Sequence, residues 1–453
     1  MHAPPQTSRI HLLHERVDAL RHQPIAATEK GFGTIAQMQN RAGGAQMQNR
    51  AGGAQRHVSA ASLAAERPPA LGGDFTMPLL VLRDTALAHN TGAMARWCAS
   101  TGVLLAPHGK TTMAPALFER QLAAGAWGMT AATISQVQVY RSFGIDRILI
   151  ANELTDRAGI AWLAAELTAD LGWECFAYVD SLAGVRLLDD ALTAAGASRP
   201  LSVLVELGFP GGRTGCRSVD EAIDVAKAAS QARALALAGV SGYEGGIGHG
   251  GEPEALDAVA GFCGRLRELG ELVAASVPGL IVSAGGSAYF DVVARELTAG
   301  SRAPGAVSPV VVLRSGCYLT HDHGEYAAIG PASRRLGPDL VPAIELWAPV
   351  LSCPEPGLAL ACAGRRDVSF DQGMPVPLRL RRHDGTIEPA SGLVTTRLDD
   401  QHAYISVPPD VTLTPGDLLC FGISHPCTTL DKWRVIPVVD DDYHVIDAVH
   451  TFF

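Results

Sequence analysis

Residues 107–110 read PHGK and carry a lysine that could do covalent chemistry. They follow a short apolar run, VLLA, that is typical of a strand. In an extended segment side chains alternate, so His108 and Lys110 are expected to point to the same side. A lysine taken out of water there would have a lowered pKa and could form a Schiff base with a carbonyl group. The alternative is a lysine that covers apolar surface at the end of a strand while its ammonium stays in water.

Three further patches follow later apolar runs. Arg213 in GGRTG could donate a fork of hydrogen bonds to a hydroxyl or a carboxylate, and Tyr243 in GYEGG would bring an aromatic ring with a polar tip. SAGGS is a short glycine loop whose backbone N–H groups could cradle one phosphate. Each patch also has a plain structural alternative, namely a surface arginine in a turn, a packed tyrosine and an ordinary glycine turn. The loop contributes Ser283, Gly285, Gly286 and Ser287.

SHPC near the C-terminus offers a second kind of chemistry. If residues 425–427 are extended, His425 and Cys427 project to one side, as an imidazole and a thiolate suited to Zn²⁺. Two protein ligands would leave positions open for water and substrate, which a catalytic metal needs. His321 and His323 form a rival pair, which we interpret as loop histidines near a domain junction.

Three acidic residues and two cysteines near these motifs stay without an assigned role. We expect the acids either to support the site or to lie in solvated turns. These residues are Glu244, Asp367, Asp371, Cys216 and Cys317.

The elements that must position these residues are short apolar runs separated by stretches of helical periodicity, beginning at about residue 78. Apolar strands that alternate with amphipathic helices predict a parallel sheet covered on both faces, and about eight such units predict a barrel. The polar motifs follow the strands, at the rim where barrels place their sites. The runs are PLLVLR, VLLAPHGK, GMTAAT, RILIAN, CFAYVD, SVLVELG, ALAGVSGYEG, LIVSAGGS and VVVLRSG.

The flanking parts differ from this pattern. After about residue 335 the sequence reads as strands and turns, which predicts a second, mostly β domain. Residues 36–44 and 45–53 are two copies of AQMQNRAGG, too short for a solenoid and interpreted as a flexible duplication beside a short helix over 11–20. We therefore expect a partly flexible extension over 1–75, a barrel over 76–325 and a β domain over 326–453.

The order of PLLVLR, PHGKTTM, RTG, GYEGG and SAGGS resembles the alanine-racemase-like pyridoxal-phosphate enzymes of fold type III. Within them the chain is similar to the D-serine dehydratase and D-threonine aldolase family, which shares P-H-x-K-T. It looks especially like the bacterial amino acid deaminases of that family because of LRSGCY, RRDVSFDQG and SHPCTTLDKW. The resemblance runs from about residue 75 to the C-terminus. It implies a TIM-type (β/α)8 barrel that binds the cofactor, a C-terminal β domain that completes the site, and a homodimer.

The resemblance also assigns roles to the motif residues. Lys110 matches the Schiff-base lysine, Tyr243 the contact to the ring nitrogen, and Arg213 a cofactor-contacting arginine, with His108 beside them. Ser283, Gly285, Gly286 and Ser287 match the phosphate loop. His425 and Cys427 match the metal motif, for Zn²⁺ or another divalent ion. The aldolase branch resembles His-x-Asp at this place and the dehydratase branch His-x-Cys, so the sequence falls with the latter.

The implied reaction is dehydration of a β-hydroxy D-amino acid such as D-serine to a keto acid and ammonia. Lys110 would act as the base that takes the α-proton, and the metal would assist departure of the hydroxyl group. Two other functions stay open. One is retro-aldol cleavage of D-threonine-type substrates, against which Cys427 counts. The other is a non-catalytic protein that binds pyridoxal phosphate, against which the long β domain counts.

Bulk properties limit the partners and the compartment. The formal charge of −10 and the absence of basic runs argue against nucleic acid, because phosphate contacts dominate such binding. No apolar stretch reaches the length of a membrane span and the N-terminus lacks a signal-peptide pattern, which predicts a cytoplasmic protein. The nine cysteines are scattered, which favours reduced thiols over a disulfide framework.

Overall fold

The computed structural model describes residues 7–32, 35, 57–248, 250–299 and 309–453. Eight parallel strands form a barrel in the order β2-β9-β8-β7-β6-β5-β4-β3. The first and last strands meet through a bridge between His108 and Thr130 and through a bond from the Trp127 amide to the Leu105 carbonyl, 2.7 Å. The predicted barrel is confirmed. Its strands are β2 (Leu104–Leu105), β3 (Met129–Ala131), β4 (Arg147–Glu153), β5 (Glu174–Val179), β6 (Leu201–Leu207), β7 (Leu235–Gly242), β8 (Ile281–Ala284) and β9 (Val310–Leu313).

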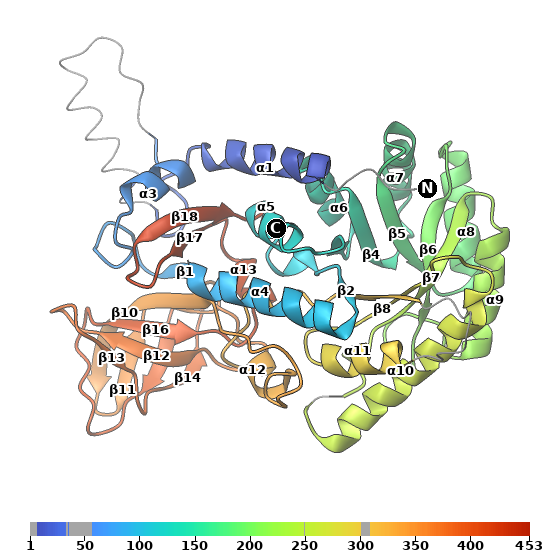
Figure 1. Ribbon diagram of the computed structural model, residues 1–453. Helices are drawn as coiled ribbons and strands as arrows, with labels where there is room; N and C mark the ends of the chain where they lie inside the picture. The colour runs from blue at the N-terminus through green and yellow to red at the C-terminus, as the bar shows by residue number, and fades with distance from the viewer. Residues whose placement is uncertain (1–6, 33–34, 36–56, 249, 300–308) are drawn as a thin grey trace, which may run out of the picture.

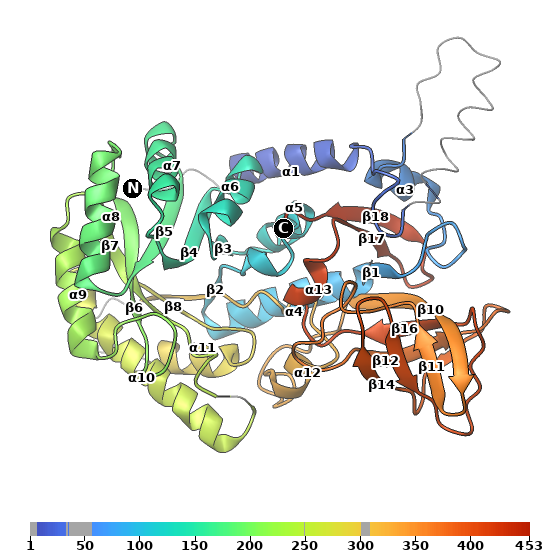
Figure 2. The same cartoon turned by 180° about the vertical axis from the view of Figure 1, so that it is seen from behind.

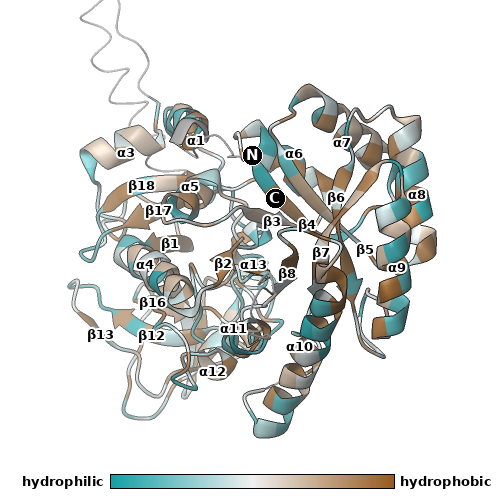
Figure 3. Ribbon diagram, turned by 45° about the vertical axis from the view of Figure 1, so that its right-hand side comes forward, coloured by the Kyte–Doolittle hydropathy of each residue, from teal (hydrophilic) through white to brown (hydrophobic). Residues whose placement is uncertain are grey.

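Helices cover the outside of the barrel, and their apolar faces turn toward the strands (Figure 3). In α9, Ala222, Val225 and Ala229 are buried at helical spacing, and Ser218 caps the first turn through the Glu221 amide. The helices are α4 (Asp84–Thr101), α5 (Pro115–Ala123), α6 (Ile134–Ser142), α7 (Arg157–Ala169), α8 (Leu182–Ala194), α9 (Val219–Gln231), α10 (Pro253–Ala274) and α11 (Phe290–Thr298).

A second, mainly antiparallel sheet forms the β domain, which lies beside the barrel (Figure 1). Short helices α12 (Glu325–Ile329) and α13 (Cys427–Leu430) belong to its loops. Its later strands are β10 (Ile344–Glu355), β11 (Leu358–Ala361), β12 (Val376–Arg381), β13 (Ile387–Pro389), β14 (Val394–Leu398), β15 (Ala403–Ser406), β16 (Leu418–Gly422), β17 (Val435–Val439) and β18 (Val445–His450).

The run PLLVLR does not form the first barrel strand, as the sequence suggested. It forms β1 (Leu79–Arg83), which pairs antiparallel with β10 and parallel with β17 inside the β-domain sheet. The physical reason for the misreading is that β1 is buried on both faces, so its continuous apolar run looks like a barrel strand. The PHGK motif, which stands in the second of the predicted runs, consequently follows the first barrel strand, β2.

The N-terminal segment contains packed structure on both sides of the repeat. The predicted helix is present as α1 (Thr7–Arg21), which lies along α5 and β18 (Figures 1 and 2). Ile25 and Phe32 are buried in a cluster with Trp347 of β10, and α3 (Ala60–Glu66) packs on β18. The two AQMQNRAGG copies lie outside the described residues. Residues around them therefore contribute to the core of the β domain.

Candidate active site

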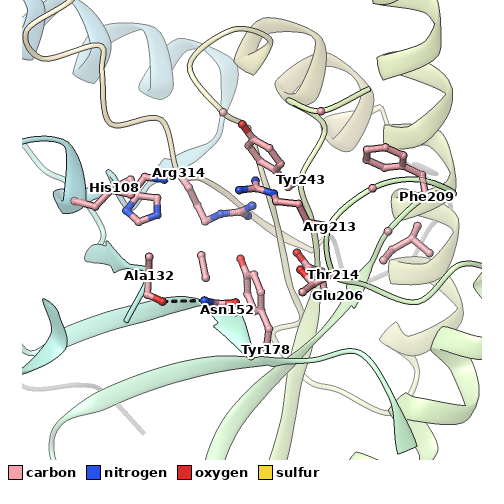
Figure 4. A pocket seen from close by; sticks show the side chains of 18 of the residues that line it. His108, Ala132, Asn152, Tyr178, Glu206, Phe209, Arg213, Thr214, Tyr243 and Arg314 are labelled. Carbon is pink, nitrogen blue, oxygen red and sulfur yellow. Dashed lines mark hydrogen bonds between the residues drawn. The ribbon is translucent and has the colours of Figure 1, made fainter. Parts of the chain in front are cut away.

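A pocket of about 580 Å³ opens at the carboxyl ends of the barrel strands (Figure 4). Both His108 and Lys110 of the PHGK motif line it, and the Lys110 side chain is exposed there. They reach it differently from the prediction, because residues 109–111 form a 3₁₀ turn and not an extended strand. Position 109 suits glycine because the Tyr140 side chain packs closely against it, and a Cβ atom there would lie 2.4 Å from the Tyr140 hydroxyl oxygen. The motif thus enters the pocket, although the alternation argument does not explain how.

His108 and Arg314 line the same pocket as the lysine. Burial, together with the charges of Lys110 and Arg314, lowers the pKa of His108 well below its ordinary value. Its ring is therefore neutral at physiological pH. Nδ1 of His108 is buried and has no hydrogen-bond partner among the described residues.

Arg213 and Tyr243 come together at the opposite wall of the pocket. The guanidinium group lies 4.3 Å from the centre of the tyrosine ring. Burial and the neighbouring Glu244 raise the pKa of Tyr243, so its hydroxyl stays protonated. Gly245 is required beside it, because a Cβ atom there would lie 2.3 Å from the hydroxyl oxygen.

The glycine loop of SAGGS is present, but its amides already have an acceptor. The N–H groups of Gly285 and Gly286 donate to the buried carboxylate of Glu244, at 3.1 and 2.6 Å. Gly285 has φ +96°, and a Cβ atom there would lie 2.7 Å from Leu313, so this position needs glycine. A phosphate at these amides would have to displace Glu244 or bind other donors.

The two serines of the loop do not line this pocket. The Ser283 hydroxyl donates to the Val312 carbonyl and accepts from Arg314, and the Ser287 hydroxyl accepts from the Cys317 amide. They hold the loop against the last barrel strand.

Arg314 is a pocket residue that the sequence analysis did not nominate. It is buried, and its guanidinium donates to Ser283 Oγ at 2.8 Å and to the Gly242 carbonyl at 2.7 Å. The available signal was an arginine directly after the apolar run VVVL, in LRSGCY. Two arginines and a lysine thus surround the pocket, which suits an anionic ligand.

One carboxyl group lines the pocket, and a second interacts with it from nearby. Glu206 is buried and lines the pocket, and its Oε2 meets no donor among the described residues. Burial, the charge of Glu206 and a hydrogen bond with it raise the pKa of Glu153 to about 8. Glu153 therefore keeps its proton near neutral pH. Tyr178, also buried, adds a hydroxyl without a partner in the described structure.

The proposed metal ligands lie beside the lysine turn and belong to the β domain. Cys427 Sγ is 3.4 Å from the hydroxyl of Thr111, the residue after Lys110, and 3.7 Å from Cys317 Sγ. The segment is not extended, because Pro426 has helical dihedrals and Cys427 begins α13. The two side chains are still close enough to interact electrostatically.

The electrostatics of this pair suit a metal ligand. Hydrogen bonds with Cys317 and Thr111 and the charge of His425 outweigh burial and lower the pKa of Cys427 well below its ordinary value, which favours the thiolate. Burial opposes a charge on His425, but interactions with Cys427 and Asp371 outweigh it and raise its pKa to about 9, so a metal would have to displace a proton from the imidazole. Asp371 Oδ2 holds Nδ1 of His425 at 2.7 Å, which leaves Nε2 for a metal.

The described part of the chain supplies two ligands here and not a complete set. Within it, no three His, Cys, Asp or Glu side chains converge closely enough to hold a metal ion. A metal bound by His425 and Cys427 would therefore take water or substrate at its remaining positions, as a catalytic ion does.

The other predicted candidates lie away from the pocket. Burial lowers the pKa of His321 and of His323 to about 4, and both lie in the segment that joins the barrel to β10, as expected for the domain junction. Asp367 is buried, and its Oδ1 pairs with Lys30 at 3.0 Å. Cys216 is buried beyond the end of β6, where its thiol donates to the Asp180 carbonyl.

No helix within the described ranges is both long and apolar enough to cross a membrane.

Comparison with known proteins gives matches over most of the chain. Residues 83–292 match the alanine racemase N-terminal domain, and residues 343–439 match the putative serine dehydratase domain. The D-threonine aldolase of Arthrobacter sp is 28% identical over 393 residues, which cover 83% of this chain and 93% of that protein. The structure of D-threonine aldolase from Filomicrobium marinum is similar with a TM-score of 0.70 at 27% identity, over 83% of this chain and 95% of that one.

A dehydratase is similar as well. The D-threo-3-hydroxyaspartate dehydratase from Delftia sp. HT23 matches with a TM-score of 0.64 at 23% identity, over 83% of this chain and 97% of that one. Two domain matches in this order, and a shared fold over most of each chain, agree with the resemblance read from the motifs. The chain therefore combines an alanine racemase N-terminal domain with a putative serine dehydratase domain, and it is similar in sequence and fold to D-threonine aldolases.

Proposed function

We propose that this protein is a pyridoxal-phosphate- and metal-dependent lyase that dehydrates a β-hydroxy D-amino acid such as D-serine. The products are a keto acid and ammonia. The observation that carries the proposal is the placement of Cys427 against Thr111, directly after Lys110, with His425 beside the thiolate. A lysine for the cofactor and a ligand pair for a metal thus border one space.

The pocket residues fit the cofactor in charge and shape. Lys110 supplies the amine, and Arg213 and Arg314 supply positive charge for its phosphate or phenolate oxygens. Unpartnered polar atoms on His108 and Tyr178 offer further contacts among the described residues. When bound, the cofactor withdraws electrons from the substrate's α-carbon. Lys110 is then the residue placed to take the α-proton.

The ligand pair fits a divalent ion such as Zn²⁺. A thiolate and an imidazole held by a carboxylate are a donor set that zinc favours. A metal there supplies a Lewis acid to the β-hydroxyl group. Two of the similar solved structures are variants of a D-threo-3-hydroxyaspartate dehydratase. In one variant alanine replaces a histidine, and in the other, which is in a metal-free form, alanine replaces a cysteine two positions later in the chain. This spacing equals that of His425 and Cys427.

The second candidate is aldol cleavage, favoured by the names of the matched curated relatives, a D-threonine aldolase and a 3-hydroxy-D-aspartate aldolase. We favour dehydration because of the cysteine in SHPC. Incubation with D-serine and D-threonine separates the two. Pyruvate and 2-oxobutyrate with ammonia support dehydration, whereas glycine with acetaldehyde from D-threonine would overturn it.

The cofactor and metal assignments are tested separately. The protein with bound cofactor should be yellow, and Lys110→Ala should abolish this absorbance. Borohydride reduction of the wild type should attach the cofactor covalently to Lys110. An adduct on another lysine would contradict the assignment. His425→Ala and Cys427→Ala should keep the absorbance and lose turnover about a thousandfold, since Lewis-acid stabilisation contributes several kcal/mol. Near-normal turnover of both variants after exhaustive chelation would refute the metal site.

A further inference from the structure

Lys30, in the segment before the barrel, makes three contacts with the β domain. Its ammonium is 3.0 Å from Asp367 Oδ1, donates to the Arg366 carbonyl at 2.6 Å, and lies 4.8 Å from the centre of the Trp433 ring. The lysine side chain is 41% exposed, but that of Asp367 is only 3% exposed. A buried carboxylate needs a partner, and in the described structure Lys30 is the cationic partner of Asp367.

Asp367 fixes one end of the loop formed by residues 364–373. Its Oδ2 accepts from the Gly364 amide at 3.1 Å, and its carbonyl accepts from the Trp433 indole at 2.8 Å. Gly364 is itself packed tightly, because a Cβ atom there would lie 2.2 Å from the Asp400 carbonyl oxygen. The loop therefore depends on a few specific polar bonds at this end.

The other end of the same loop holds His425. Ser369 Oγ accepts from the His425 amide at 3.1 Å, and Asp371 Oδ2 holds Nδ1 of its ring at 2.7 Å. Backbone and ring of the proposed metal ligand are thus both fixed by residues two and four positions after Asp367. A shift of the loop would move these partners together.

The segment that carries Lys30 is itself anchored. Ile25 and Phe32 are 5% and 0% exposed, in a cluster with Trp347 and Val435. The Ile25 amide donates to the Val58 carbonyl at 2.7 Å. Both family matches begin at residue 83 or later, so Lys30 lies outside the two matched domains.

We propose that Lys30 is a positioning residue for the active site, which holds loop 364–373 and, through it, His425 in the orientation that binds the metal. The inference rests on the metal-dependent function proposed above. It assigns to the N-terminal segment a role in the reaction and not only in stability.

The test compares holoenzyme with Lys30→Met, Lys30→Arg and, as a matched control, Lys227→Met, which removes an exposed lysine of α9 paired with Asp224. Methionine keeps the length of the side chain and removes the charge. Hydrogen exchange of peptides over 364–373 and 425–430 reports the loop without reference to metal. Competition of Zn²⁺ with a chromophoric chelator reports the ligand pair, and cofactor absorbance reports the barrel.

We expect Lys30→Met to speed hydrogen exchange in the loop and at the His425 amide. It should also weaken the binding affinity for Zn²⁺ about tenfold, as loss of other groups that orient a metal ligand does. The kcat should fall while KM and cofactor absorbance stay near wild type. Lys30→Arg should keep loop exchange, Zn²⁺ affinity and kcat near the wild-type values, because arginine preserves the positive charge. Lys227→Met should leave all three unchanged.

The inference would be overturned if hydrogen exchange in the loop were the same in Lys30→Met as in wild type. It would also be overturned if wild type bound Zn²⁺ and Lys30→Met bound it with the same affinity. If exchange rises equally in barrel peptides, Lys30 acts on global stability and the inference is likewise wrong. A wild type that binds no Zn²⁺, with loop exchange still raised in Lys30→Met, would instead refute the proposed metal site.

Discussion

Replacing Glu153 by glutamine should stabilise the protein at alkaline pH and have little effect at acid pH. Glu153 ends β4 and interacts with the buried carboxyl group of Glu206. The glutamine amide can donate to Glu206 at every pH, so it replaces the protonated form of Glu153 permanently. The variant therefore removes a repulsion that wild type acquires only when both groups ionise.

The sign and size follow from the shifted pKa. Burial and the neighbouring Glu206 raise the pKa of Glu153 from 4.5 to about 8 in the folded chain. Well below 4.5 the group is protonated in both the folded and the unfolded chain, so nothing is lost. As pH rises toward 8 the unfolded chain ionises first and wild-type stability falls, by roughly 5 kcal/mol at most at about 1.36 kcal/mol per pKa unit. Because the site is partly open to water, we expect about 2 kcal/mol.

Urea unfolding at pH 5, 7 and 9 measures this difference, with Glu268→Gln, an exposed glutamate of α10, as the control. The advantage of Glu153→Gln should grow steadily with pH, while the control stays flat. A stability difference that is constant between pH 5 and pH 9, or a variant that is less stable at pH 9, would refute the raised pKa of Glu153.

Three further predictions follow from single contacts. Phe32→Ala should cost about 3–5 kcal/mol in urea unfolding, because the ring is fully buried; a cost below about 1 kcal/mol would show that the segment is dispensable. Asn90→Ala should cost about 3 kcal/mol, since its side chain satisfies the Leu319 carbonyl and both backbone groups of Val341; a neutral effect would mean that water replaces these bonds. Asp371→Asn should weaken Zn²⁺ about 10–100-fold in chelator competition and leave cofactor absorbance unchanged; loss of absorbance would contradict separate sites.

The sequence predicts the barrel because its strands are buried on both faces and its helices are amphipathic. It also predicts which motifs gather at the rim, since Lys110, Arg213 and Tyr243 all line one pocket. These inferences rest on local pattern. The apolar run of β1 shows their limit, because burial on both faces does not reveal which sheet a strand joins.

The parts that could not be predicted depend on contacts between distant segments. Glu244 accepts from the loop amides 41 and 42 residues later, and Glu206 meets Glu153 on another strand. Nothing in the motifs GYEGG or SVLVELG indicates these partners. The same holds for Lys30, whose carboxylate partner lies 337 residues away.

The position of β1 has a consequence for how the chain is made. Leu82 is paired with Ile344 on one side and with Val438 on the other, so this strand emerges from the ribosome hundreds of residues before either partner. The barrel can close before β10 and β17 are made, and until then the backbone groups of β1 have neither strand to pair with. Closing the sheet then requires both ends of the chain to meet across a folded barrel, which makes the last step one of high contact order. Newly made chains that stop short of β17 would expose an apolar edge, and release of such fragments should favour aggregation over a stable isolated barrel.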